Sequence, residues 1–345
     1  MPMQKATQVV LASRPATPKA SLDNFRVEEI PMPVAGPGEV LLRVDYLSLD
    51  PYMRGRMNDR KSYAKPADID QPMPGESVAT VLESNASELA KGDVVLVQSG
   101  WRSHLAADAA GLTKLELNGV QESAYLGVLG MPGFTAYSGL AAIGKPKTGE
   151  TLVVGAASGP VGSLVGQLAK QAGARSVGIA GGPKKCAYLL DTLGFDAAID
   201  HKAPDFARQL EAACSDGIDV YFENVGGAVW NAVVPLLNQY ARVPVCGLMA
   251  QTSGNASAPD LSEDHVAALM RAVLTRSLLI RGYINYEFTG QYHEQFLKEV
   301  GALLRDGKIK HLEDITDGLE NAPQAFLDMI DGRNFGKVLV RVAKR

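Results

Sequence analysis

Residues 151–170 read TLVVGAASGPVGSLVGQLAK and combine a strand, a glycine turn and the start of a helix. The apolar run at 152–154 is short and β-branched, which is typical of a parallel strand covered on both faces. The glycines within 155–162 allow tight turning and a close approach of the backbone to a ligand. Pro160 suits a first helical position, because its φ is preset and it lacks an amide hydrogen. This segment therefore predicts a buried strand, a glycine turn and the N-terminus of a helix.

A strand that leads through a glycine turn into a helix N-terminus is an anion site, because free amides and the helix dipole both point at it. The strict dinucleotide pattern is G-x-G-x-x-G, whereas the register here is Gly155-x-Ala157-x-Gly159-x-x-Gly162. An ordinary turn that needs glycine for packing is the alternative at this point. Features in the rest of the chain distinguish a dinucleotide site from an ordinary turn.

Predicted strands and helices alternate after the glycine turn, which indicates a doubly wound parallel sheet, the Rossmann arrangement. Ligands of such sheets bind at the carboxyl ends of the strands. The further strands are predicted at 175–182, 196–200, 218–227, 240–250 and 277–285.

The region from about Val9 to Ala110 is β-rich and punctuated by glycine and proline, which predicts a compact barrel-like β domain. The segment 332–343 reads as a closing strand that returns to this domain. We therefore expect a first domain of residues 1–128 completed by 312–345, with the cofactor domain, 129–311, inserted between them.

Composition limits the classes of function. The chain has 345 residues, 46% apolar and 21% charged, with a net charge of −4 and no basic block. This balance disfavours nucleic acid and anionic membranes as partners, and no apolar run is long enough to span a membrane. Three dispersed cysteines, Cys186, Cys214 and Cys246, fit a reducing cytoplasm without a disulfide framework.

The second predicted strand indicates which dinucleotide binds. An NAD site usually places an acidic residue there, about 20 residues after the motif. Here Gly181 and Gly182 are followed by Pro183, Lys184 and Lys185, and a lysine suits a phosphate. NADPH is therefore favoured, although a solvated helix face is the alternative for the two lysines.

The sequence predicts no metal. The first domain has no cysteine and one histidine, His104, and Gly75-Glu76-Ser77 stands where a zinc dehydrogenase commonly has Gly-His-Glu. Without a Lewis acid, hydride addition to an activated carbon–carbon double bond remains open, because the conjugated carbonyl supplies the electron sink.

The chain resembles the zinc-independent medium-chain reductases, in the branch of prostaglandin reductases, plant alkenal double-bond reductases and bacterial curcumin reductases. The segments that carry the resemblance are LASRP (11–15), YLSLDPYMRGRM (46–57), LGVLGMPGFTAYSGL (126–140), GAASGPVGSLVGQLAK (155–170), AGGPKKC (180–186), DGIDVYFENVGG (216–227), ARVPVCGL (241–248), DITDGLENAPQAF (314–326) and GRNFGK (332–337). Together they extend over nearly the whole chain in the expected order.

The resemblance implies a GroES-like β-barrel catalytic domain, an inserted Rossmann domain, NADPH and a homodimer. The residues implied at the pyrophosphate are Pro160, Val161, Gly162 and Ser163, and those at the 2′-phosphate are Gly182, Lys185 and His201. The residues implied at the ribose and nicotinamide are Met53, Asn224, Cys246, Gly247, Thr252, Tyr283, Ile284, Asn285 and Asn334.

Tyr52 is the predicted catalytic phenol, as an oxyanion-type donor to the developing enolate, with Tyr63 as a second substrate contact. Packing at a barrel corner is the alternative for Tyr52. Thr252 stands where relatives usually have a tyrosine, and Asn285 replaces an apolar residue, so both bear on substrate range. No acid–base dyad is visible, and the proton is expected from water.

The predicted function is NADPH-dependent reduction of the α,β double bond of an enone or enal, with hydride delivered to the β-carbon. Curcumin-like dienones, medium-chain enals and prostaglandin-like ketones all remain open as substrates. Two alternatives are a quinone reductase of the same architecture and an inactive NADPH-binding protein.

Overall fold

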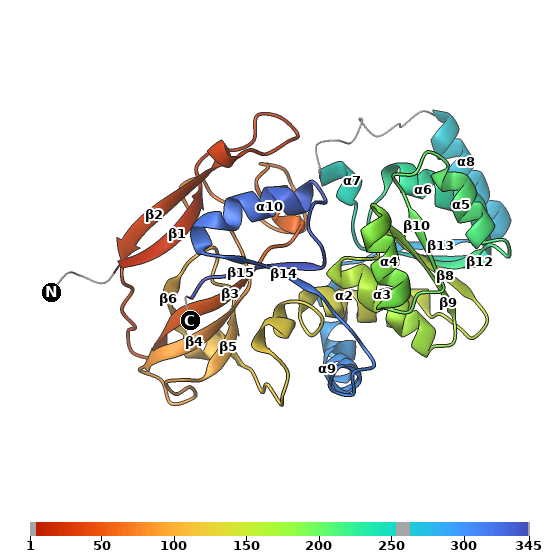
Figure 1. Ribbon diagram of the computed structural model, residues 1–345. Coiled ribbons are helices and arrows are strands. Elements are labelled where there is room, and N and C mark those ends of the chain that lie inside the picture. The colour runs from red at the N-terminus through yellow and green to blue at the C-terminus, as the bar shows by residue number, and fades with distance from the viewer. Residues whose placement is uncertain (1–4, 253–262, 344–345) are drawn as a thin grey trace. The chain divides into compact units, whose positions relative to one another are not determined.

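The computed structural model describes residues 5–252 and 263–343, with side chains described for 5–250 and 266–343. The chain divides into two compact units (Figure 1). Unit 1 comprises the described residues within Met1–Leu126 and Glu313–Arg345, and unit 2 is Gly127–Leu312.

Unit 2 contains a six-stranded sheet in the order β10-β9-β8-β11-β12-β13, and every neighbouring pair is parallel. Its strands are β8 (Thr151–Val154), β9 (Arg175–Ala180), β10 (Ala197–Asp200), β11 (Ile218–Phe222), β12 (Leu237–Val245) and β13 (Leu279–Gly282). The chain moves outward on one side from β8 to β10 and resumes at β11 on the other side of β8. The predicted doubly wound sheet is confirmed, and its switch point lies between β8 and β11, where such sheets bind ligands.

Helices cover both faces of this sheet (Figure 1). The helices α5 (Phe206–Ala213), α6 (Gly227–Val233) and α8 (Glu263–Arg276) share one apolar core with the strands. On the other face, α3 (Pro160–Gln171) contacts α2 (Met131–Gly139), which also contacts α9 (Thr289–Arg305). Right-handed crossovers place α3 and α4 (Pro183–Asp191) on the same face, because both connect strands that advance in one direction.

The five strands predicted after β8 are all shorter in the structure than the sequence pattern indicates, and loop pairing explains the ends of two of them. Strand β11 ends at Phe222, and β12 leaves the sheet after Val245. The amides of Cys246 and Met249 donate to the carbonyls of Glu223 and Asn224, so residues beyond Val245 pair with the loop after β11. A short helix, α7 (Met249–Thr252), therefore forms where the strand was predicted to continue.

Unit 1 is built on a β-sheet whose strands run in the order β14-β15-β3-β4-β5-β7, with β6 also paired to β3. These strands are β3 (Glu39–Ser48), β4 (Ser77–Ser84), β5 (Val94–Val97), β6 (His104–Asp108), β7 (Thr113–Lys114), β14 (Glu313–Asp317) and β15 (Lys337–Arg341). A separate antiparallel pair joins β1 (Lys5–Leu11) to β2 (Phe25–Pro31). Among the described residues the pairing path stays open, with β14 and β7 at its ends.

The carboxyl-terminal segment completes this sheet, because β15 pairs antiparallel to β3 with Leu339 opposite Ser48. An aromatic cluster fills the core beneath α10 (Ala322–Ile330). Trp101 stacks on Phe25 at 5.6 Å between ring centroids and meets the edge of Phe326 at 5.7 Å. Strand β3 is held by its pairing with β15 and by its packing on this core. The short helix that follows β3 is positioned as a result.

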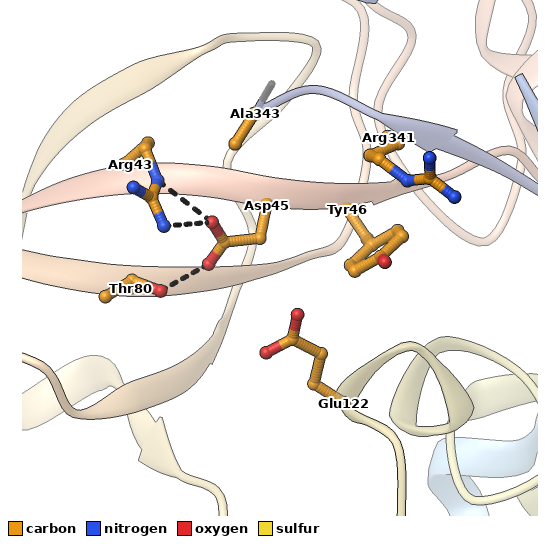
Figure 2. Close-up of a pocket in the computed structure, with 7 residues that line it drawn as sticks. All are labelled: Arg43, Asp45, Tyr46, Thr80, Glu122, Arg341 and Ala343. Atoms are coloured by element: carbon orange, nitrogen blue, oxygen red, sulfur yellow. Dashed lines mark hydrogen bonds and ion pairs between the residues drawn. The ribbon is translucent and has the colours of Figure 1, made fainter. Parts of the chain in front are cut away.

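A cavity of about 230 Å³ in unit 1 is lined by Arg43, Asp45, Tyr46, Thr80, Glu122, Arg341 and Ala343 (Figure 2). The carboxylate of Asp45 accepts from the Arg43 guanidinium at 2.7 Å and from the Thr80 hydroxyl. None of the predicted site residues lines this cavity.

Candidate cofactor and substrate site

The turn after β8 requires glycine at residue 162, the third glycine of the motif. A Cβ on Gly162 would lie 2.5 Å from the carbonyl oxygen of Ala156 and 2.7 Å from the Cα of Ala157. The first helical hydrogen bond of α3 runs from the amide of Ser163 to the carbonyl of Gly159, which leaves earlier amides of the turn without a helical acceptor. The predicted pyrophosphate residues are thus brought together at the N-terminus of a 12-residue helix. This turn, residues 159–163, is called the phosphate cradle below, because free amides at a helix N-terminus fit a phosphate group.

The loop after β9 brings together the residues predicted at the 2′-phosphate. Gly182 has a φ of +93°, a conformation that favours glycine, and α4 with Lys185 begins directly after it. A Cβ on Gly181 would lie 2.9 Å from His201 Nε2, so the imidazole covers this loop. Burial, with the charges of Lys202 and Lys185, lowers the pKa of His201 below its usual value.

Asp200, at the end of β10, was missed by the sequence reasoning. One oxygen of its carboxylate accepts the amide of Gly182 at 2.8 Å and that of Lys202 at 2.9 Å. The donation by Gly182 holds the pKa of Asp200 below its usual value. The sequence signal for Asp200 was its position at the end of a predicted parallel strand, where ligands of such sheets bind. The fold gives Asp200 the role of fixing the loop that leads into α4, the helix that carries Lys185.

Asn224 lies at the end of β11 and joins three strand ends. Its amide nitrogen donates to the carbonyl of Gly155 at 2.9 Å, and its amide oxygen accepts from the Cys246 thiol at 2.8 Å. A Cβ on Gly247 would lie 3.2 Å from the Asn224 carbonyl, so the two loops are closely packed. Three predicted cofactor residues therefore meet at the switch point, with the side chains of Asn224 and Cys246 bonded to the protein itself.

Glu223 is a second functional residue that the sequence reasoning missed. It is 1% exposed, and its Oε1 accepts from the amides of Val225 and Gly226 at 2.5 and 2.9 Å and from the Tyr221 hydroxyl at 3.1 Å. Burial raises the pKa of the Glu223 carboxyl despite these donors. The side chain holds the turn that begins α6, directly beside Asn224.

The segment after β13 is anchored to α2. The Tyr283 hydroxyl donates to the carbonyl of Thr135 at 2.6 Å, and the Asn285 amide donates to the Thr135 hydroxyl at 3.1 Å. Ile284 between them is half-buried. These donors bond within unit 2, so a polar contact of Asn285 with substrate stays a prediction. The backbone of Thr252 ends α7, and its side chain lies outside the described residues.

Tyr52 begins the short helix α1 (Tyr52–Arg56) of unit 1. The guanidinium of Arg56 lies 5.6 Å from the Tyr52 ring centroid and 5.3 Å from that of Tyr63, so it contacts both predicted phenols. Burial, with the charges of Asp50 and Glu76, raises the pKa of Tyr52 well above its usual value. The hydroxyl therefore keeps its proton at neutral pH and is able to donate a hydrogen bond.

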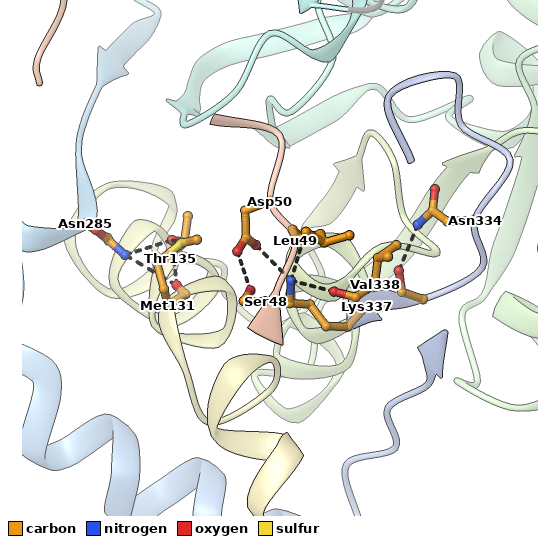
Figure 3. A network of polar contacts seen from close by, with 10 residues as sticks. Ser48, Leu49, Asp50, Met131, Thr135, Asn285, Asn334, Lys337 and Val338 are labelled. Carbon is orange, nitrogen blue, oxygen red and sulfur yellow. Dashed lines mark hydrogen bonds and ion pairs between the residues drawn. The ribbon is translucent and has the colours of Figure 1, made fainter. Parts of the chain in front are cut away.

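The other two predicted residues of unit 1 have local partners. Met53 is fully buried in the unit 1 core, so it packs directly beneath the chain segment that carries Tyr52. The Asn334 amide donates to the carbonyl of Gly336 at 3.0 Å and shapes the loop before β15 (Figure 3). Their contacts with a cofactor stay predictions.

Among the described residues, no group of three or more His, Cys, Asp or Glu side chains is arranged to hold a metal ion. The absence of a metal stays a prediction from the sequence.

Comparisons with known proteins agree with this arrangement. Residues 7–115 match a family model described as the N-terminal domain of oxidoreductase, and residues 160–300 match one described as zinc-binding dehydrogenase. The NADPH-dependent curcumin reductase of Escherichia coli is 50% identical over 99% of this chain and 98% of its own length. A 2-alkenal reductase (NADP(+)-dependent) of Nicotiana tabacum is 38% identical over 90% of this chain and 89% of its own.

A solved structure of CurA from Vibrio vulnificus in complex with NADPH has a TM-score of 0.93 and 47% identity, covering 98% of this chain and 100% of that one. The two units thus define a medium-chain dehydrogenase/reductase. The chain belongs to the branch of that family that contains the curcumin and alkenal reductases.

Proposed function

We propose that this protein reduces the α,β carbon–carbon double bond of an enone or enal with NADPH as the hydride donor. The observation that carries the proposal is the phosphate cradle at the switch point, in a chain that is 50% identical to an NADPH-dependent curcumin reductase. When bound, the reduced nicotinamide supplies the hydride for the β-carbon.

Unit 2 is proposed to hold the cofactor. The turn at Gly159–Ser163 receives the pyrophosphate, because the amides of Val161 and Gly162 precede the first helical hydrogen bond of α3, which the Ser163 amide makes. Lys185 and His201 surround the 2′-phosphate, and the Asp200 carboxylate fixes the loop between them. Asn224, Cys246, Gly247 and the 283–285 segment shape the nicotinamide end, with Glu223 fixing the turn beside Asn224.

Unit 1 is proposed to supply the groups that stabilise the reacting carbonyl. The Tyr52 hydroxyl keeps its proton and donates to the enolate oxygen that develops when the β-carbon accepts hydride. Arg56 restrains the Tyr52 ring and links it to Tyr63, which is 53% exposed and suited to contact a substrate.

The proposed assembly is a homodimer. Strand β13 lies at the edge of the unit 2 sheet, and Leu279 on it is 49% exposed. On the adjacent α8, Val266, Met270 and Leu274 form an exposed apolar stripe at helical spacing. Among the described residues β13 has a neighbouring strand on one side only, and such an edge is suited to pair with the same edge of a second copy. Leu279→Glu is expected to give a monomer by light scattering, whereas Leu190→Glu on the exposed face of α4 leaves a dimer.

We place the protein in the cytoplasm, on the strength of its three free cysteines. In the part of the chain that the structure describes, every helix is too short or too polar to cross a membrane.

Steady-state turnover of NADPH with a simple enone, a curcuminoid and a quinone tests the proposal, with NADH and a chelator as controls. Turnover of the enones that prefers NADPH and resists the chelator supports it. Turnover of the quinone alone assigns the chain to quinone reduction, and binding of NADPH without turnover of any acceptor assigns it a binding role.

A further inference from the structure

The turn that follows β10 lies beside the loop that follows β9. The two strands are parallel neighbours with Asp200 opposite Ala180, so their carboxyl ends meet at the same edge of the unit 2 sheet. The amide of His201 continues this pairing by donating to the carbonyl of Ala180 at 3.0 Å. In a dinucleotide site the ribose is recognised at the carboxyl end of the second strand, which is β9 here. Residues of the turn after β10 therefore flank the place where the 2′-group of that ribose is expected.

The backbone of this turn, residues 200–203, is held by one aspartate. The amide of Ala203 donates to the carbonyl of Asp200 at 3.0 Å, and the amide of Lys202 donates to Asp200 Oδ1 at 2.9 Å. The same carboxylate oxygen accepts the amide of Gly182 at 2.8 Å. Asp200 thus ties the turn to the loop after β9, and the point from which the Lys202 side chain starts is fixed relative to that loop.

The Lys202 side chain lies along the loop after β9. A Cβ on Gly181 would lie 3.1 Å from Lys202 Cε and 2.9 Å from His201 Nε2, both closer than the 3.4 Å at which ordinary contact begins. Glycine at residue 181 therefore leaves the room that these two side chains occupy. Lys202 is an exposed residue, yet the carbon that carries its ammonium group lies against the loop backbone.

The charge of Lys202 is available to a ligand. In the described part of the chain its ammonium forms no ion pair with a carboxylate, whereas Lys170 and Arg208 each do. A phosphate monoester carries about 1.5 to 2 negative charges at pH 7, and a lysine binds it as a point charge. Lys185, on α4, supplies one cation at this loop, so a second cation from a different element matches the charge of a phosphate better than Lys185 alone.

We propose that Lys202 binds the 2′-phosphate of NADPH together with Lys185 and so contributes to the preference for NADPH over NADH, an inference that rests on the proposed cofactor. Lys185 reaches the phosphate from the first turn of α4, and Lys202 reaches it from the turn after β10. NADH has a hydroxyl group in place of this phosphate, so Lys202 adds little to the binding of NADH.

The test measures Kd for NADPH and for NADH with the full chain, by fluorescence of the reduced nicotinamide. Lys202→Met removes the charge and keeps most of the apolar side chain. It is expected to raise the Kd for NADPH by about 10-fold at low salt, to change the Kd for NADH by less than about 2-fold, and to lose much of the difference at high salt. Lys202→Arg, which keeps the cation, is expected to retain the preference. Lys298→Met is the matched control, because it removes the same charge from an exposed position on α9.

A phosphorus NMR titration of bound NADPH separates a direct contact from a structural role. A cation beside the 2′-phosphate lowers its second pKa, which is about 6 in a free phosphate monoester. This pKa is therefore expected to be higher in Lys202→Met than in the wild type and in Lys298→Met. An unchanged phosphate pKa would overturn the proposal, as would an equal loss of affinity for NADPH and NADH.

The outcome for the wild type distinguishes failure of this proposal from failure of the proposed cofactor. If the wild type binds NADH as tightly as NADPH, the proposed use of NADPH fails and the role of Lys202 fails with it. If the wild type prefers NADPH and Lys202→Met keeps the same ratio of Kd values, the role of Lys202 alone is refuted.

Discussion

Replacing Gly162 with alanine tests the phosphate cradle most directly within unit 2. The new Cβ would lie 2.5 Å from the carbonyl oxygen of Ala156, about 0.9 Å inside the 3.4 Å at which ordinary contact begins. The neighbouring atoms are backbone, so the turn itself has to move by a substantial part of that distance. Overpacking of this kind costs about 1–3 kcal/mol. The amides that are proposed to face the pyrophosphate move with the turn.

We expect the Kd for NADPH in Gly162→Ala to rise by roughly 10- to 100-fold, equivalent to about 1.4–2.7 kcal/mol. Thermal unfolding is expected to shift down by about 2–10 °C. Fluorescence titration with NADPH and a thermal melt measure the two effects. Gly301→Ala is the matched control, because its new Cβ meets only the flexible end of Arg305 at 3.3 Å. NADPH binding to Gly162→Ala with the wild-type Kd would refute this reading of the turn.

Three further changes have defined outcomes. Lys185→Ala should reduce the preference for NADPH over NADH about 10-fold or more, measured as the ratio of kcat/KM values, because a cationic partner of the 2′-phosphate is lost; an unchanged ratio contradicts the assignment. Phe326→Ala should lower the free energy of unfolding by about 3–5 kcal/mol in denaturant titration, because it opens a cavity beside Trp101 and Phe25; a loss below about 1 kcal/mol would show that the cluster collapses to fill it. The pKa of Glu76 is raised from 4.5 to about 7 in the folded protein, so wild-type stability should fall as pH rises between these values, relative to Glu76→Gln; parallel stability curves for the two proteins contradict the raised pKa.

The sequence predicted the α/β fold well where local chemistry decides it. The run at 152–154 became β8, fully buried, and Pro160 became the first residue of α3, because strand burial and helix starts depend on adjacent residues. The wrong strand end at 246–250 has a different cause. Its amides bond to carbonyls that follow β11, more than 20 residues earlier, and no local pattern reports such a pairing.

The candidate site could be predicted only in part, for the same reason. Glycines and lysines predicted the two phosphate-binding loops, because glycine allows a tight turn and lysine suits a phosphate. The carboxyl groups of Asp200 and Glu76 accept hydrogen bonds from residues far away in the sequence. Asp200 accepts the amide of Gly182, 18 residues earlier, and Glu76 accepts the side-chain amide of Gln98, 22 residues later. Neither partner could be assigned from spacing in the sequence.

The proposed reaction adds hydride to the β-carbon of a conjugated double bond. The most direct measurement uses NADPH deuterated at the transferred position, an enone substrate, and mass and NMR analysis of the product. The expected product is a saturated ketone with one deuterium at the β-carbon and a solvent-derived hydrogen at the α-carbon. An allylic alcohol with deuterium at the carbonyl carbon would contradict it.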